Sequence, residues 1–173
     1  SAEISSPTVP YYVVAERTVG IATIETKMRG NMVLDARGYY YDADSTMTGK
    51  GPLPPKANTP TKYAIHWLVT SYATDATDIE IKGRVEPGVK VTAIKTNITG
   101  TSTNPIYNER TGEITWAIDR IPANKGVIGK SVEAVFQIDA LPNITQIGRP
   151  MPLMGETIIK GIDEFTGSTI IAT

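Results

Sequence analysis

The chain lacks cysteine, carries one histidine in 173 residues and is poor in leucine. Without cysteine, disulfide bonds, thiol catalysis and thiolate zinc sites are excluded. Five leucines stand beside 21 isoleucines, 12 valines and 23 threonines. Leucine is the usual residue of helix cores, whereas β-branched side chains are stiff at χ1 and pack well on pleated surfaces. The composition therefore predicts an all-β protein rather than a helical bundle.

An excess of charge of one sign and a long apolar run are also missing. The 17 basic and 18 acidic residues nearly cancel and are scattered along the chain. A nucleic-acid-binding protein needs a basic stripe that neutralises phosphates. A membrane-spanning helix needs about 20 consecutive apolar residues. We therefore expect no nucleic-acid partner and no membrane span within this sequence.

Short segments of alternating apolar and polar residues follow one another, separated by turn residues. The clearest is 61–72, where Tyr63, Ile65, Trp67 and Val69 share one face. Similar patterns occupy 31–41, 79–85, 89–98, 113–121 and 131–141, with one or two strands after residue 150. This pattern is typical of an antiparallel β-sandwich with Greek-key connections over residues 31–173. We expect Trp67 and Trp116 in its core.

Two segments lie outside this regular pattern. Residues 1–30 read as an N-terminal linker or edge-strand segment, polar and proline-containing at first, with one strand or two short ones over 11–27. Residues 42–61 hold two glycines and four prolines, so they predict a long loop. Loops of this length in compact domains often serve a function.

One candidate metal site lies in that loop. Asp42 and Asp44 place carboxylates at alternate positions, which is one way to begin a calcium cage, and Asp163 would complete it if the last strands pass nearby. The alternative is that Asp42 and Asp44 form Asx-turns with their own backbone. We favour the second interpretation. Calcium is therefore a possible cofactor, and no other cofactor is expected.

His66 and the tyrosines before the loop are the other candidates. A lone histidine between Ile65 and Trp67, with no nucleophile motif, indicates a strand residue that faces water or bonds at the sheet rim, not a catalytic base. Side chains alternate along a strand, so at least one of the consecutive tyrosines points outward. Tyr40 and Tyr41 are the candidates for contact with a sugar ring or a neighbouring module. The alternative is a half-buried tyrosine that closes the end of the sandwich.

The stretch TKYAIHWLVTSYATDATDIEIKGRVEPGVKV, from residue 61, carries a Tyr-bearing strand, an Ala-Thr-Asp turn at 76–78 and Pro-Gly-Val at 87–89. YNERTGEITWAIDRIPA, at 107–123, adds a turn with Thr-Gly and a strand with Trp. Together they resemble the bacterial and archaeal surface repeat known as domain of unknown function eleven, over about two-thirds of the chain. Ser71-Tyr72 and residues 82–84 depart from the family pattern. The resemblance implies an extracellular immunoglobulin-like module of the kind strung in arrays as stalks, adhesins or envelope components.

These observations predict a non-enzymatic structural or adhesive module at the cell surface. Its expected partners are neighbouring copies or modules, joined end to end or by addition of an exposed N-terminal strand to a sheet. The alternative is a module that binds carbohydrate or another surface ligand.

Overall fold

The computed structural model describes residues 2–6, 18–42, 47, 49–95 and 103–173. Strands dominate this part of the chain, and its one helical element is a single 3₁₀ turn. In chain order the elements are β1 (Ala2–Ser6), β2 (Thr18–Ala22), β3 (Asn31–Tyr39), β4 (Thr61–Tyr72), β5 (Ala76–Arg84), β6 (Val89–Ile94), β7 (Ile106–Asn108), β8 (Glu113–Ile121), β9 (Val132–Ala140), η1 (Ile144–Gln146), β10 (Ile158–Asp163) and β11 (Thr169–Ala172).

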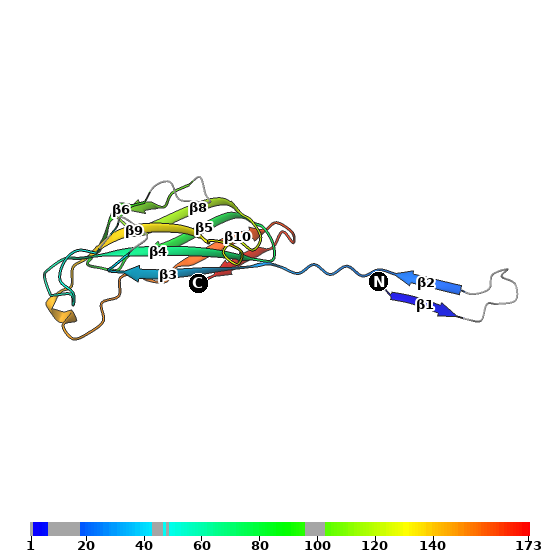
Figure 1. Cartoon of the computed structure of the whole chain (residues 1–173), viewed down its shortest axis with the longest axis horizontal. Coiled ribbons are helices and arrows are strands. Elements are labelled where there is room, and N and C mark those ends of the chain that lie inside the picture. Colours follow the sequence, from blue (N-terminus) through cyan, green and yellow to red (C-terminus); the bar gives the residue numbers. More distant parts are fainter. Residues whose placement is uncertain (1, 7–17, 43–46, 48, 96–102) are drawn as a thin grey trace.

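Two antiparallel sheets form the body of the molecule (Figure 1). One has the strand order β3-β4-β9-β6, and the other has the order β11-β10-β5-β8-β7. With the β7–β8 hairpin set aside, the first sheet follows the A-B-E-D order of immunoglobulin domains and the second follows G-F-C. The predicted immunoglobulin-like Greek-key sandwich is therefore confirmed, with one inserted hairpin that extends the second sheet beyond β5.

The core lies between the sheets and consists of the inward-facing residue of each alternating pair. Trp67, Trp116 and Phe136 are fully buried in it, together with a set of isoleucines and valines. The rings of Trp67 and Phe136 meet edge to face with centroids 5.1 Å apart, a favourable geometry for aromatic pairs. Both tryptophans are thus in the predicted place.

The sequence NERTGE forms the predicted hairpin turn between β7 and β8. The side chain of Asn108 accepts hydrogen bonds from the backbone N–H groups of Arg110 and Thr111. Gly112 has φ of 72°, a backbone conformation that glycine adopts at little cost. The turn chemistry written in the sequence therefore fixes where β8 begins.

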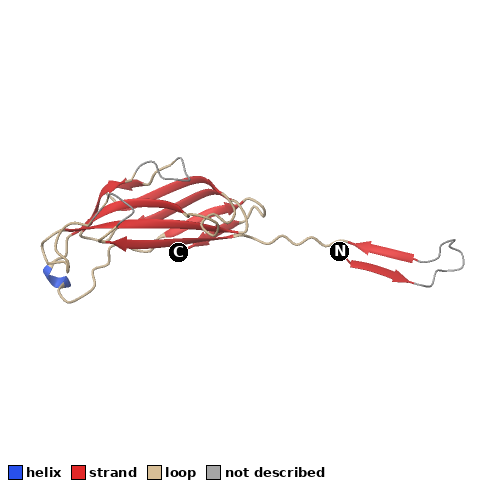
Figure 2. Ribbon diagram, in the orientation of Figure 1, coloured by secondary structure: helices blue, strands red, loops and turns tan. Residues whose placement is uncertain are grey.

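The N-terminal strands form a hairpin of their own. β1 pairs with β2 from Ala2↔Ala22 to Ser6↔Thr18, in a two-stranded sheet separate from the sandwich. The hairpin stands beyond one end of the sandwich on an extended linker (Figures 1 and 2). Residues 2–6 are therefore a paired strand, not a linker or an edge of the main sheets. Residues 11–17, where the sequence predicts strand, lie outside the described residues. We call residues 2–29 the N-terminal arm.

The long loop after β3 folds back over the outer face of the β3-β4-β9-β6 sheet. The N–H of Gly49 donates to the carbonyl of Tyr40 at 2.7 Å, and the N–H of Lys62 donates to the carbonyl of Lys50 at 2.7 Å. None of the described residues between 42 and 60 belongs to a named strand, in agreement with the sequence. These two hydrogen bonds close the loop between the end of β3 and the beginning of β4.

Candidate functional site

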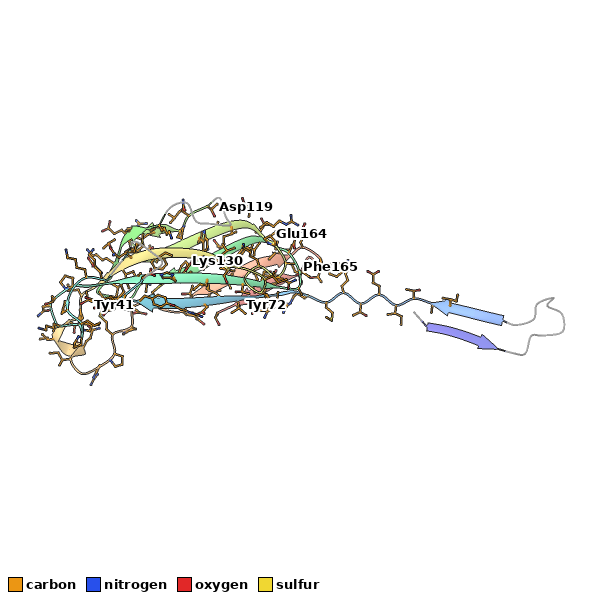
Figure 3. All side chains as sticks on the ribbon, viewed as in Figure 1. Tyr41, Tyr72, Asp119, Lys130, Glu164 and Phe165 are labelled. Atoms are coloured by element: carbon orange, nitrogen blue, oxygen red, sulfur yellow. The ribbon has the colours of Figure 1, made fainter. Side chains whose placement is uncertain are left out.

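The candidate functional residues lie in three places: at the two ends of the sandwich and around His66, beside the long loop. β3 and β4 pair from Asn31↔Tyr72 to Tyr39↔Ala64. We call the end with Asn31 and Tyr72 the near end, because the arm joins it, and the opposite end the far end. In Figure 3, Tyr72 and Phe165 lie at the near end and Tyr41 lies towards the far end.

Asp163 fastens the arm to the near end. Its carboxylate is fully buried. One oxygen accepts from the N–H of Gly30 at 2.5 Å and from the hydroxyl of Thr74 at 2.8 Å. The other accepts from the N–H groups of Phe165 and Thr166, both at 2.9 Å. Burial by itself raises the pKa of Asp163, but these four hydrogen bonds outweigh it and lower the pKa from 3.8 to about 2.

The residues around Asp163 also help to hold the arm against the near end. A Cβ at Gly30 would overlap the hydroxyl of Thr74 and lie 2.7 Å from the carbonyl oxygen of Tyr72, so a larger residue does not fit. The guanidinium of Arg29 donates to the carbonyl of Thr169 at 3.2 Å. The amine of Lys27 lies 5.0 Å from the centroid of the Phe165 ring. The last residues of the arm are therefore held against the β10–β11 turn.

The predicted calcium ligands are not brought together. Asp163 is bonded at the near end, whereas Asp42 bonds to His66, which pairs with Arg37 towards the far end of β3. Asp44 lies outside the described residues. Within the described ranges, no group of three or more histidine or acidic side chains is placed to hold a metal ion. The calcium site of the loop stays a prediction from the sequence, without Asp163.

His66 lies under the long loop between two carboxylates. Its Nε2 is 2.8 Å from Oδ2 of Asp42, and its Nδ1 is 2.5 Å from Oε1 of Glu133. The ring of Tyr39 meets the imidazole edge to face, with centroids 5.0 Å apart. His66 is only 5% exposed, so of the two expected positions, facing water or hydrogen-bonded, it takes the hydrogen-bonded one. Asp42, three positions after the end of β3, turns back over this face of the sheet and lies against the ring.

This arrangement joins the loop to two strands. Each ring nitrogen of His66 lies within hydrogen-bond distance of one carboxylate oxygen, so the imidazole links Asp42 to Glu133. The side chain of Asp42 is 6% exposed and that of Glu133 is 42% exposed. The sequence gives no sign of Glu133, because it stands 67 positions after His66. The cluster acts as a fastening of the loop on β4 and β9.

Tyr40 and Tyr41 have different surroundings. Tyr40 is partly buried, and its hydroxyl donates to the carbonyl of Gly51 at 2.7 Å. Its ring lies 6.1 Å from that of Tyr63 and 4.9 Å from that of Tyr41, edge to face in both pairs. Tyr41 is 81% exposed. Tyr40 therefore closes the sandwich end, and Tyr41 is the tyrosine that can meet a ligand.

A groove of about 690 Å³ opens at the far end. Its floor includes Tyr63, Met151 and Leu153, which pack against the core. Four prolines contribute to its walls and have no N–H to offer a ligand. We call it the distal groove. Its lining consists of residues 54–57, Tyr63, Ala140, residues 142–143, residues 146–151 and Leu153.

The distal groove is bordered by exposed apolar side chains and by positive charge. Ile147 in its lining is 72% exposed. Leu53, Leu141 and Ile144, which neighbour the lining in sequence, are 55%, 48% and 66% exposed. The charged residues of the lining are Lys56 and Arg149, both basic. Such a concentration of exposed apolar residues usually marks a binding surface. Sequence patterns do not reveal it, because it joins two distant loops.

No protein-family model matches the sequence, and no curated protein is significantly similar to it. Among solved structures, the chain is similar to the chitin-binding domain of a hyperthermophilic chitinase from Pyrococcus furiosus, at 15% identity and a TM-score of 0.34, over 86% of this chain and 98% of that one. It is also similar to BcpA*(D312A), the major pilin subunit of Bacillus cereus, at 10% identity and a TM-score of 0.46. That match covers 99% of this chain and 46% of the pilin, so the chain spans about half the pilin's length.

Proposed function

We propose that this chain is a non-enzymatic, extracellular structural module that associates with further copies of itself. The observation that carries the proposal is the N-terminal arm. Its hairpin is a two-stranded sheet that pairs with no other strand of the described part of the chain, and a hairpin of this kind is marginally stable alone in water. Residues 21–29 are all exposed. The arm therefore gains stability when it packs on another surface.

The way in which the arm is attached supports a structural role. Asp163, Gly30 and Arg29 fasten its last residues to the near end. An attachment through a buried carboxylate anchors the base of the arm to the sandwich while the arm engages a partner. The proposal includes the family that residues 60–173 resemble, whose modules occur in arrays on cell surfaces. No helix among the described residues has the length and apolar character needed to cross a membrane.

Association is tested on the full chain by light scattering coupled to size-exclusion chromatography over a wide concentration range. The unchanged protein is expected to form species larger than a monomer as concentration rises. The triple variant Ile21→Ser, Ile24→Ser and Met28→Ser removes exposed apolar groups from the arm and is expected to remain monomeric.

The matched control carries three equivalent changes outside the arm, Val127→Ser, Ile128→Ser and Ile171→Ser, at positions that are 50%, 78% and 59% exposed. It is expected to associate like the unchanged protein. A wild-type chain that stays monomeric at millimolar concentration contradicts the proposed function.

A second candidate function is carbohydrate binding, which the exposure of Tyr41 favours. An aromatic ring that is 81% exposed beside a second tyrosine offers an apolar face to a sugar. A pull-down with insoluble polysaccharides, chitin included, tests it. Binding that is lost in Tyr41→Ala and kept in Tyr72→Ala, a tyrosine at the near end that is 42% exposed, supports this function. Equal retention of both variants, or no binding by the wild-type chain, rejects it.

A further inference from the structure

The two ends of the molecule carry surfaces of matching character. The arm leaves the near end with Ile21, Ile24 and Met28 exposed by 74%, 82% and 78%. The distal groove lies at the far end and is lined by apolar side chains and prolines. Exposed apolar residues are therefore present on both the arm and the groove, and mutual burial stabilises a contact by about 25 cal/mol per Å² of apolar surface removed from water.

The groove and the outer part of the arm carry opposite net charge. The groove contributes Lys56 and Arg149 and no acidic residue. The arm as a whole holds three acidic and three basic residues, but two of the basic ones, Lys27 and Arg29, lie against the near end. Its outer part, residues 2–26, holds Glu3, Glu16 and Glu25 against a single basic residue, Arg17. Opposite potentials favour encounter and disfavour the contact of one groove with another. The arm is thus a better occupant of the groove than a second groove is.

The arm cannot place Ile24 in the groove of its own sandwich. Gly30 is held at the near end, and Tyr63 of the groove stands nine positions along β4 from Tyr72, or about 30 Å at about 3.3 Å per residue. Ile24 is six positions from Gly30, so a fully extended chain carries it about 20 Å. The groove that receives Ile24 must belong to another molecule.

From these observations we infer that the N-terminal arm of one copy docks in the distal groove of the next. The inference rests on the proposed function and names the partner surface. The contact is heterologous, since it joins two different surfaces, and it leaves a free arm at one end of the pair and a free groove at the other. Copies therefore add head to tail into open chains.

A mixing experiment with two full-length variants tests this arrangement. The first variant, Ile24→Asp, has a defective arm and an intact groove. The second, Ile147→Asp with Arg149→Glu, has a defective groove and an intact arm. All three positions are exposed, so both variants are expected to fold, with melting temperatures close to that of the wild-type chain.

Each variant alone is expected to be monomeric at a concentration at which the wild-type chain forms long assemblies. An equimolar mixture is expected to form dimers and nothing longer, because the one intact arm fits the one intact groove. The exposed control Ile128→Asp is expected to assemble like the wild-type chain.

Other results overturn the inference and leave the proposed function standing. Self-association of the groove variant shows that the arm binds elsewhere, such as another arm or a sheet edge. A mixture that stays monomeric shows that the two surfaces do not meet. In both cases the assembly of the wild-type chain, measured in the same run, still supports a self-associating module.

The absence of cysteine provides a second readout. A chain with Ile24→Cys and Ile147→Cys is expected to form, under mild oxidation, a ladder of disulfide-linked oligomers on a non-reducing gel. Ile24→Cys alone is expected to give no more than a trace of dimer. A strong dimer band from Ile24→Cys alone identifies contact between arms and contradicts docking in the groove.

Discussion

At the scale of single residues, Asp163 connects more of the structure than any sequence pattern suggests. Its carboxylate joins the root of the arm at Gly30, the β4–β5 turn at Thr74 and the β10–β11 turn at Phe165 and Thr166. A buried carboxylate is favourable only when such donors surround it. The residue singled out as a metal ligand is therefore satisfied by the protein itself.

Replacing Asp163 is expected to destabilise the fold in a pH-dependent way. Asp163→Asn turns an amide group towards N–H donors and is expected to lower the free energy of unfolding by about 2 kcal/mol at neutral pH. The pKa of Asp163 is lowered in the folded state, so its contribution is present above 3.8 and is lost as pH falls towards about 2. Chemical denaturation of both proteins across this pH range is expected to show their unfolding free energies converging.

The exposed carboxylate Asp119 provides the matched control. Asp119→Asn is expected to change stability by less than about 0.5 kcal/mol. A difference between wild type and Asp163→Asn that stays constant from neutral pH down to about 2 contradicts the assignment of the lowered pKa.

At the scale of elements, the long loop after β3 is attached to the sheet at several points. Backbone bonds at Gly49 and Lys62 close its ends, and His66 holds Asp42 beneath it. Because the attachment of the loop depends on His66, which is bonded on both sides, we expect the loss of this side chain to affect the loop more than the strands.

His66→Ala is expected to loosen this loop. The carboxylates of Asp42 and Glu133 lose their shared hydrogen-bond partner, and the expected cost is about 2 kcal/mol. Digestion of the native protein by a lysine-specific protease is expected to cut after Lys50 at least several-fold faster. Arg37→Gln, at the position paired with His66 on β3, is the control, and equal rates for both variants reject the fastening role.

The elements also show which structural features can be predicted from the sequence. The alternation in 61–72 and 113–121 predicted β4 and β8, because a strand has a local period of two residues. Tyr41 does point outward as expected, but it lies beyond the end of β3 at Tyr39, so strand alternation is not the reason. The bond from Asp163 to Gly30 spans 133 positions, and that from His66 to Glu133 spans 67. Contacts of this kind follow from topology, which local patterns do not encode.

At the scale of the whole molecule, the two proposed contact surfaces lie at opposite ends of the sandwich. The arm occupies one end and the distal groove the other, so the proposed contact extends the molecule along its own length (Figure 1). The sequence predicted that N-terminal residues and loop residues meet a neighbour. It did not predict the groove, whose lining joins residues 54–57 to residues 146–151 across the far end.

The attachment of the arm at Gly30 has a mechanical consequence. Tension on the arm enters at the residue before β3, while a neighbour seated at the far end draws on the beginning of β4. These antiparallel strands are then pulled in opposite directions along nine register pairs, from Asn31↔Tyr72 to Tyr39↔Ala64. Their hydrogen bonds lie across the pull and are loaded in shear, so they share the force instead of unzipping one by one. The sandwich therefore resists extension along the line of the proposed contact.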